Sequence, residues 1–192
     1  MLGKEGGRIM YAVQSLQRAL IIHGFDPGRN DGIFGGKTAR AAVRFQESRK
    51  LVPDGHIGPK TARHLFRPFV DDAERKLAIP DHLLHGQVAL ESAYDPGAQG
   101  AHDDRDRGLV QVNSRWHPDI TDEQAYGRPR VMINWSAKRL RDAYDGLRVA
   151  SWDPAIAQHN NPEKARQWAR DGEAPDQQIA DYVRLVRRVA AT

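Results

Sequence analysis

A ten-residue pattern occurs twice in the first third of the chain, at an offset of 23 residues. Residues 31–40 (DGIFGGKTAR) and 54–63 (DGHIGPKTAR) are identical at seven of the ten positions, too many for two unrelated helix starts. Each copy begins with an Asp-Gly turn, where glycine supplies backbone conformations that other residues resist, and then leads into a helix. The repeat therefore predicts a small domain with internal pseudo-symmetry, because two copies are too few for a solenoid.

Three helices are predicted around these turns, at residues 8–23, 38–50 and 59–65. Gly24 is well placed to end the first helix, and Pro59 suits the first turn of the third. The first helix has one apolar stripe, formed by Ile9, Val13, Leu16 and Leu20. The pattern predicts a three-helix domain.

This part of the chain resembles the peptidoglycan-binding domain that occurs at the ends of many bacterial and phage wall-active enzymes. The resemblance runs from Tyr11 to Leu65 and implies a three-helix bundle that binds wall peptides or glycan without cutting them. The residues that carry it are Leu16-Gln17-x-x-Leu20, Gly24-Phe25-x-Pro27-Gly28, Asp31-Gly32-x-Phe34-Gly35, Ala42-Val43-x-Phe45-Gln46 and Asp54-Gly55-x-x-Gly58.

The charge distribution agrees with an anionic polymer as partner. Residues 1–67 carry 12 Lys and Arg against 5 Asp and Glu, a net charge of +7, whereas residues 68–192 carry a net charge of −3. A basic region of this kind binds nucleic acid or a cell wall rich in carboxylates or phosphates. Because the basic residues are scattered and few aromatic residues lie among them, a nucleic-acid partner is not expected.

Composition excludes several other classes. The chain has no cysteine, so disulfides, thiolate metal sites and cysteine nucleophiles are excluded. No apolar run approaches the roughly 20 residues that a membrane-spanning helix needs, so no membrane insertion is expected. The N-terminus lacks the apolar stretch of a secretory signal peptide, and we expect a monomer that stays in a host cytoplasm until it is released to the wall.

The remainder of the chain reads as successive helices. Helices are predicted at residues 70–77 and 131–145, with a domain boundary near residue 68 and a loop region between residues 116 and 129. Pro154 opens a short helix, Asn161 caps the next one, and that helix ends at Gly172. A final helix begins near Pro175 and packs through Ile179, Val183 and Val186.

The stretch from residue 83 to residue 113 places a carboxylate at the edge of a core. Leu84, Val88 and Glu91 share one stripe of a helix that must end soon afterwards, because Asp95-Pro96-Gly97 is a cluster of helix breakers. Glu91 thus lies in the last turn, where partial burial and the helix dipole both raise its pKa. A glutamate with a raised pKa is suited to general acid catalysis. A polar loop follows, and then at most a small strand element near residues 108–113.

Two short motifs in this stretch, Glu91-Ser92 and Gly108-Leu109-Val110-Gln111, are similar to those of the soluble lytic transglycosylase and goose-type lysozyme superfamily. The resemblance covers roughly residues 69–168. It implies an α-rich lysozyme-like fold with Glu91 as the catalytic acid.

The same resemblance implies further site residues. Asp104, in the pair Asp104-Arg105, takes the place of the goose-type aspartate on the water side of the sugar. Asp103 and Asp106 are the alternative candidates for this second carboxylate. Where that pattern often has a second aspartate, this chain has Asn113, which can orient a water but cannot act as its base. The implied substrate contacts are Ser92, Gln111, Asn113, His159 and Asn160. The histidine departs from the tyrosine of the family motif, and capping of a helix is the alternative role for it.

A metal site is not expected, and no cofactor is required. His82 and His85 have the i, i+3 spacing of a ligand pair on a helix, but no third ligand stands at a characteristic spacing and no His-Glu-x-x-His occurs.

The sequence as a whole predicts a mainly α protein with at most a small β element. It has a peptidoglycan-binding domain at residues 1–67 and a lysozyme-like domain at residues 68–192. The expected activity is that of an endolysin-type muramidase, with a lytic transglycosylase and a non-catalytic wall-binding or virion protein as the alternatives.

Overall fold

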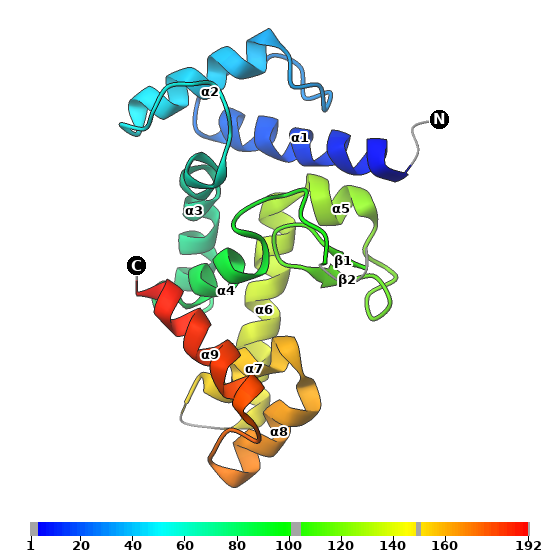
Figure 1. The fold of residues 1–192 in the computed structure, drawn as a ribbon, viewed down its shortest axis with the longest axis vertical. Coiled ribbons are helices and arrows are strands. Elements are labelled where there is room, and N and C mark those ends of the chain that lie inside the picture. Colours follow the sequence, from blue (N-terminus) through cyan, green and yellow to red (C-terminus); the bar gives the residue numbers. More distant parts are fainter. Residues whose placement is uncertain (1–3, 101–104, 149–150, 192) are drawn as a thin grey trace. The chain divides into compact units, whose positions relative to one another are not determined.

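The computed structural model describes residues 4–100, 105–148 and 151–191, and helices dominate it (Figure 1). A single two-stranded antiparallel sheet is present among these residues, so the mainly α prediction with a small β element is confirmed. The elements are α1 (Lys4–Ile22), α2 (Gly36–Ser48), α3 (Pro59–Lys76), α4 (Leu83–Ser92), β1 (Asp106–Arg107), β2 (Val112–Asn113), α5 (Asp122–Gly127), α6 (Pro129–Leu147), α7 (Asp153–Asn160), α8 (Pro162–Asp171) and α9 (Gln177–Ala190).

The chain divides into two compact units. The first comprises Met1–Pro68 and Glu91–Met132, and the second comprises Phe69–Leu90 and Ile133–Thr192. Helices α3, α4 and α6 each begin in one unit and end in the other. Among the described residues, no helix is both long and apolar enough to cross a membrane.

The repeated Asp-Gly turns in the first unit are each held by one buried glutamine. Gln17 on α1 donates from Nε2 to the carboxylate of Asp31 (3.3 Å), the carbonyl of Ile33 (3.1 Å) and the hydroxyl of Thr38 (3.3 Å). Its Oε1 accepts from the backbone N–H of Gly32 at 3.0 Å. The side chain therefore joins α1, the turn and the start of α2.

Gln46 on α2 makes the equivalent set of bonds to the second copy of the repeat. Its Nε2 donates to the carboxylate of Asp54 (2.8 Å), the carbonyl of His56 (2.8 Å) and the hydroxyl of Thr61 (3.2 Å), and its Oε1 accepts from the N–H of Gly55 (2.9 Å). Both glutamines are 1% exposed. The predicted pseudo-symmetry is thus present as hydrogen bonding as well as sequence.

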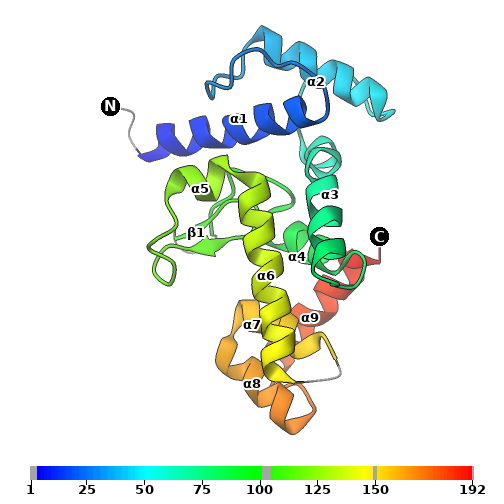
Figure 2. The same ribbon diagram turned by 180° about the vertical axis from the view of Figure 1, so that it is seen from behind.

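Helix α1 ends where the sequence predicts, but its buried face differs from the predicted stripe. Gly24 has φ +83°, and the N–H of Phe25 bonds back to the carbonyl of Leu20, as in a glycine-terminated helix. Leu20 is buried, whereas Ile9 is 52% exposed, so the expected stripe is wrong at its first position. Gln17 lies on the buried face because it must reach the first Asp-Gly turn. In both views α1 runs beside α5 (Figures 1 and 2).

Helix α3 corrects the prediction of two separate helices at 59–65 and 70–77. It runs unbroken from Pro59 to Lys76 with Pro68 inside it. Proline lacks an N–H, so a helix that contains it loses one main-chain hydrogen bond and normally bends or stops. Here the apolar residues on both sides of the proline, Phe66 and Phe69, are buried, and this burial offsets the loss.

Helix α5 was not predicted, since residues 116–129 were expected to form a loop region. Thr121 and Gln124 form a capping box: the Thr121 hydroxyl accepts from the N–H of Gln124, and the Gln124 side chain accepts from the N–H of Thr121. Reciprocal capping of this kind satisfies two N–H groups at a helix start. The Thr-x-x-Gln spacing was the signal for this helix.

In the second unit, α7 packs against both α8 and α9 (Figure 2). Helix α8 has the predicted ends: the Asn161 side chain accepts from the N–H of Glu163 and Lys164, and Gly172 has φ +80°. Helix α4 approaches α9 closely at Gly86, where an added Cβ would lie 2.2 Å from the carbonyl oxygen of Val186. Ile179, Val183 and Val186 of α9 are buried, as predicted.

Candidate active site

Glu91 lies in the last turn of α4, where the sequence placed it. Leu84 and Val88, the other two members of its stripe, are fully buried, and Glu91 itself is half-buried. The helix ends at Ser92, before the expected breakers, because Ala93 (φ +51°) and Tyr94 (φ +65°) both adopt left-handed backbone. Two successive non-glycine residues with positive φ are uncommon. They turn the chain sharply away from the helix immediately after the glutamate.

Ser92 joins the two motifs that carry the lysozyme resemblance. Its buried hydroxyl donates a 2.9 Å hydrogen bond to the carbonyl of Leu109. Leu109 and Val110 are themselves buried, so the bond is shielded from water. The hydroxyl predicted to contact substrate therefore fixes the Gly108–Gln111 loop to the end of α4.

The Gly108–Gln111 segment is a tight turn, and the small strand element expected near residues 108–113 is present at its end as β2, Val112–Asn113. Gly108 has φ +71° and Gln111 has φ +48°, conformations that interrupt a strand. A Cβ at Gly108 would lie 2.2 Å from the carbonyl oxygen of Ala125 in α5, so only glycine permits this approach. Gln111 Nε2 donates to the carbonyl of Gly108 at 2.9 Å, which closes the turn between β1 and β2.

Asn113 forms a hydrogen bond with Asp106, one of the alternative candidates for the second catalytic carboxylate. Asp106 and Asn113 are paired across the hairpin, and Asn113 Nδ2 donates to Asp106 Oδ1 at 2.7 Å. The Asn113 amide oxygen accepts from the N–H of Arg115 at 3.0 Å, which fixes its orientation. Asp106 is half-buried. An aspartate oriented in this way is a candidate partner for a catalytic acid.

Of the four remaining predicted site residues, two lie outside the described residues and two belong to the second unit. Asp104 and Asp103 lie outside the described residues. His159 and Asn160 are the last two residues of α7 and belong to the second unit, where His159 is half-buried and Asn160 is exposed. The cap of the following helix is Asn161, so capping of α8 is not the role of His159.

A polar cavity of about 430 Å³ lies beside the β1–β2 hairpin in the first unit. Arg107, 6% exposed, donates from one Nη to Asp122 (2.7 Å) and from the other to the carbonyl of Ile120 (2.9 Å). Its buried Nε–H has no hydrogen-bond partner among the described residues. This cavity is not evident from the sequence, because its walls come from distant segments: Glu5, Arg8, Gln99, Arg107, Ser114, Asp122 and Tyr126.

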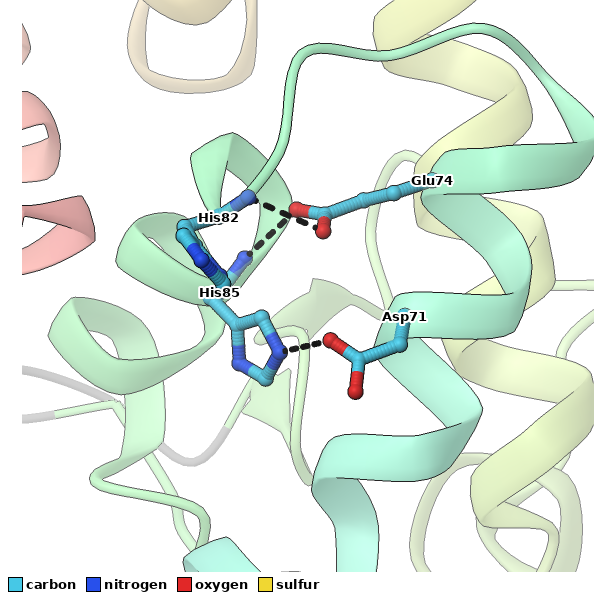
Figure 3. A group of neighbouring side chains, drawn as sticks. All are labelled: Asp71, Glu74, His82 and His85. Carbon is cyan, nitrogen blue, oxygen red and sulfur yellow. Dashed lines mark hydrogen bonds and ion pairs between the residues drawn. The ribbon is translucent and has the colours of Figure 1, made fainter.

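The second unit contains a further group that sequence spacing did not predict. Asp71 and Glu74 from α3 meet His82 and His85 from the start of α4 (Figure 3). Burial of the Glu74 carboxyl raises its pKa, and hydrogen bonds from the backbone N–H groups of α4 oppose that rise. The two i, i+3 pairs, Asp-x-x-Glu and His-x-x-His, were the available signal.

The wall-binding prediction is supported by comparison with known families. Residues 10–65 match the family described as a putative peptidoglycan binding domain. The match includes both Asp-Gly turns and both buried glutamines, so it covers the pseudo-symmetric part of the first unit. Peptidoglycan is accordingly the partner that the N-terminal domain indicates, and a role at the bacterial cell wall follows from it.

Proposed function

We propose that this protein is a muramidase that cleaves the β-1,4 bond between N-acetylmuramic acid and N-acetylglucosamine, with Glu91 as the general acid. The observation that carries the proposal is the hydrogen bond from Ser92 to Leu109. It joins the helix end that bears Glu91 to the Gly108–Gln111 loop, so the two motifs of the resemblance are in direct contact. The match of residues 10–65 to a peptidoglycan-binding domain supports peptidoglycan as the substrate.

In this proposal Glu91 protonates the glycosidic oxygen as the bond to the muramic acid carbon breaks. An inverting hydrolase then needs a second carboxylate, roughly 6.5–9.5 Å away, to activate a water on the opposite face of the sugar. Asp104 is the proposed base, and Asp106 is the alternative that Asn113 orients. If neither acts, a hydroxyl of the muramyl residue closes an anhydro ring instead, which is the chemistry of a lytic transglycosylase.

The first test is Glu91→Gln in the full-length protein. We expect clearing of a peptidoglycan suspension to fall by at least about 10²–10⁴, the usual contribution of a general acid, while co-sedimentation with walls is unchanged. Glu163→Gln is the matched control, because Glu163 is an exposed glutamate in the first turn of α8. Near-normal clearing by Glu91→Gln would remove Glu91 from the mechanism, and a wild-type protein that binds walls without clearing them would indicate a non-catalytic role.

Mass spectrometry of the released fragments tests the type of cleavage. We expect reducing muramic ends from the wild type and loss of most activity in Asp104→Asn or Asp106→Asn, whichever residue is the base. If all ends are 1,6-anhydromuramic and both variants retain full activity, the enzyme is a lytic transglycosylase with Glu91 as its catalytic carboxylate.

A further inference from the structure

Four side chains with metal-binding chemistry meet in the second unit. Asp71 and Glu74 lie one turn apart on α3, and His82 and His85 lie one turn apart at the start of α4. One ligand-type atom from each residue lies within 4.8 Å of the corresponding atom of every other residue (Figure 3). The group is formed by the reversal of the chain between α3 and α4.

The two buried members are held in fixed positions. Glu74, 2% exposed, accepts hydrogen bonds from the backbone N–H of His82 (3.0 Å), Leu84 (2.7 Å) and His85 (3.2 Å). Among the described residues, its Oε2 accepts a hydrogen bond from His82 alone, so this oxygen keeps a lone pair for a further partner. His85, whose side chain is 5% exposed, places Nε2 2.9 Å from Asp71 Oδ1. Both side chains are therefore positioned before any ligand binds.

An ion-free explanation accounts for part of this arrangement. Glu74 caps the N-terminus of α4, and Asp71 pairs with His85, as carboxylates and imidazoles often do. Neither role needs the imidazole of His82, which lies beside His85 with ring centroids 5.7 Å apart. His82 also has φ +67°, a left-handed conformation that is unfavourable for a non-glycine residue. A glycine there would make the same backbone turn at lower cost.

The four groups suit a divalent transition metal. Zn²⁺ binds imidazole nitrogen and carboxylate oxygen at about 2.0–2.2 Å, in a tetrahedral arrangement. The four ligand atoms must therefore move closer together when the ion binds. We expect the side chains of His82 and Asp71 to move, because His82 is exposed and the Asp71 side chain is 43% exposed. A metal binds imidazole in its neutral form and carboxylate in its charged form, and a ligand set of two imidazoles and two carboxylates in these forms has a negative charge that a divalent cation neutralises.

We propose that Asp71, Glu74, His82 and His85 form a Zn²⁺-class metal site that joins α3 to α4. All four ligand positions are filled by protein atoms, which is typical of a structural rather than a catalytic zinc site. The bound ion fixes the reversal between the two helices. Binding needs no sugar substrate, so the site is independent of the proposed muramidase activity.

The test is a Zn²⁺ titration of the full-length protein after its metals have been removed with EDTA, read by competition with a chromogenic chelator. We expect one Zn²⁺ per chain and a rise in the unfolding temperature when the ion is in excess over its Kd. His82→Ala and Asp71→Asn should each weaken binding by at least about tenfold, since loss of even an outer-shell partner costs 10–100-fold. Both side chains are sufficiently exposed for these variants to fold, which circular dichroism would check.

His56→Ala is the control for adventitious Zn²⁺ binding to surface histidines, because His56 is exposed and belongs to the first unit. It should bind Zn²⁺ as the wild type does, and Co²⁺ in the wild-type site should give the visible absorption of a tetrahedral complex. Wild-type affinity in both His82→Ala and Asp71→Asn, or no stoichiometric binding by the wild type, would overturn the proposal. Wall clearing is not a readout here, so this result and that for Glu91→Gln can be distinguished.

Discussion

The side-chain amide of Gln46 donates a 2.8 Å hydrogen bond to the carboxylate of Asp54, and Gln17 and Asp31 make the same contact in the other copy of the repeat. Each aspartate also accepts from the N–H two residues later, at 2.9 Å and 3.0 Å respectively. That backbone bond first, and the glutamine second, lower the pKa of both carboxyls. The repeat is thus a unit of one turn, one aspartate and one buried glutamine.

Gln46→Leu should lower the free energy of unfolding by about 2–6 kcal/mol. The variant keeps the volume of the side chain but leaves the buried N–H of Gly55 and the carbonyl of His56 without their partner, and each such loss costs about 1–3 kcal/mol. Urea denaturation measures the change. Gln178→Leu, at an exposed position of α9, should change stability by less than about 0.5 kcal/mol. Equal effects at the two positions would show that the Gln46 bonds contribute nothing.

Gly86→Ala should destabilise the protein by about 1–3 kcal/mol, as overpacking of a core does. The new Cβ would lie 2.2 Å from the carbonyl oxygen of Val186, and a backbone atom cannot move aside by changing rotamer. Gly146→Ala is the control, since nothing lies within 4 Å of a Cβ at that helical position. There the higher helix propensity of alanine should stabilise by up to about 1 kcal/mol. Opposite shifts in unfolding temperature are expected, and a stabilising Gly86→Ala would contradict the close approach of α4 to α9.

Ser92→Ala tests the bond between the two lysozyme-like motifs. It leaves the buried carbonyl of Leu109 without its donor, so we expect a loss of about 1–3 kcal/mol in stability. Wall clearing should also fall, because the Gly108–Gln111 loop is no longer fixed to the helix end that bears Glu91. Ser48→Ala removes a similar hydroxyl–carbonyl bond at an exposed residue, where water replaces it, and should have little effect. Unchanged clearing by Ser92→Ala would show that the bond does not position the loop.

Acidification should weaken the first unit through His23. Its Nε2 lies 2.9 Å from the carbonyl of Leu65, and its Nδ1 lies 3.2 Å from the guanidinium of Arg49, a pattern that suits a neutral ring. Burial lowers the pKa of His23, the bond to Leu65 opposes this, and Arg49 lowers the pKa further. The unfolded chain therefore takes up the proton first. The stability that His23 contributes is complete above pH 6.5, its ordinary pKa, and is lost as the pH falls through the lowered value.

The measurement is the urea midpoint at several pH values between 7.5 and 5. The wild type should lose more stability over this interval than His23→Gln, whose side chain does not titrate. His64, whose pKa is lowered mainly by burial, contributes in the same direction and is unchanged in both proteins. Parallel pH profiles for the wild type and the variant would rule out His23 as a source of the acid sensitivity.

The sequence predicted those features that depend on short-range interactions. Gly24 and Gly172 end helices with left-handed backbone, and Asn161 caps α8 with its own side chain. The chemistry of each helix end depends on a few neighbouring residues, so the local sequence is enough to predict it. The two Asp-Gly turns were predicted for the same reason, and the placement of Glu91 in a last turn followed from the periodicity of Leu84 and Val88.

Only the tertiary structure decided the features that depend on packing between distant segments. Burial of Phe66 and Phe69 carries α3 through Pro68, and the turn at Gly108, which packs against Ala125, limits the expected strand element to Val112–Asn113. Asp71 and Glu74 join the two histidines only because the chain reverses after α3. Local helix propensity is worth about 1 kcal/mol or less for most residues and about 3 kcal/mol for a proline inside a helix, whereas burial of each large apolar side chain is worth about 1.5–3 kcal/mol. Where the two conflict, the fold decides, and the sequence pattern alone does not reveal which contacts will form.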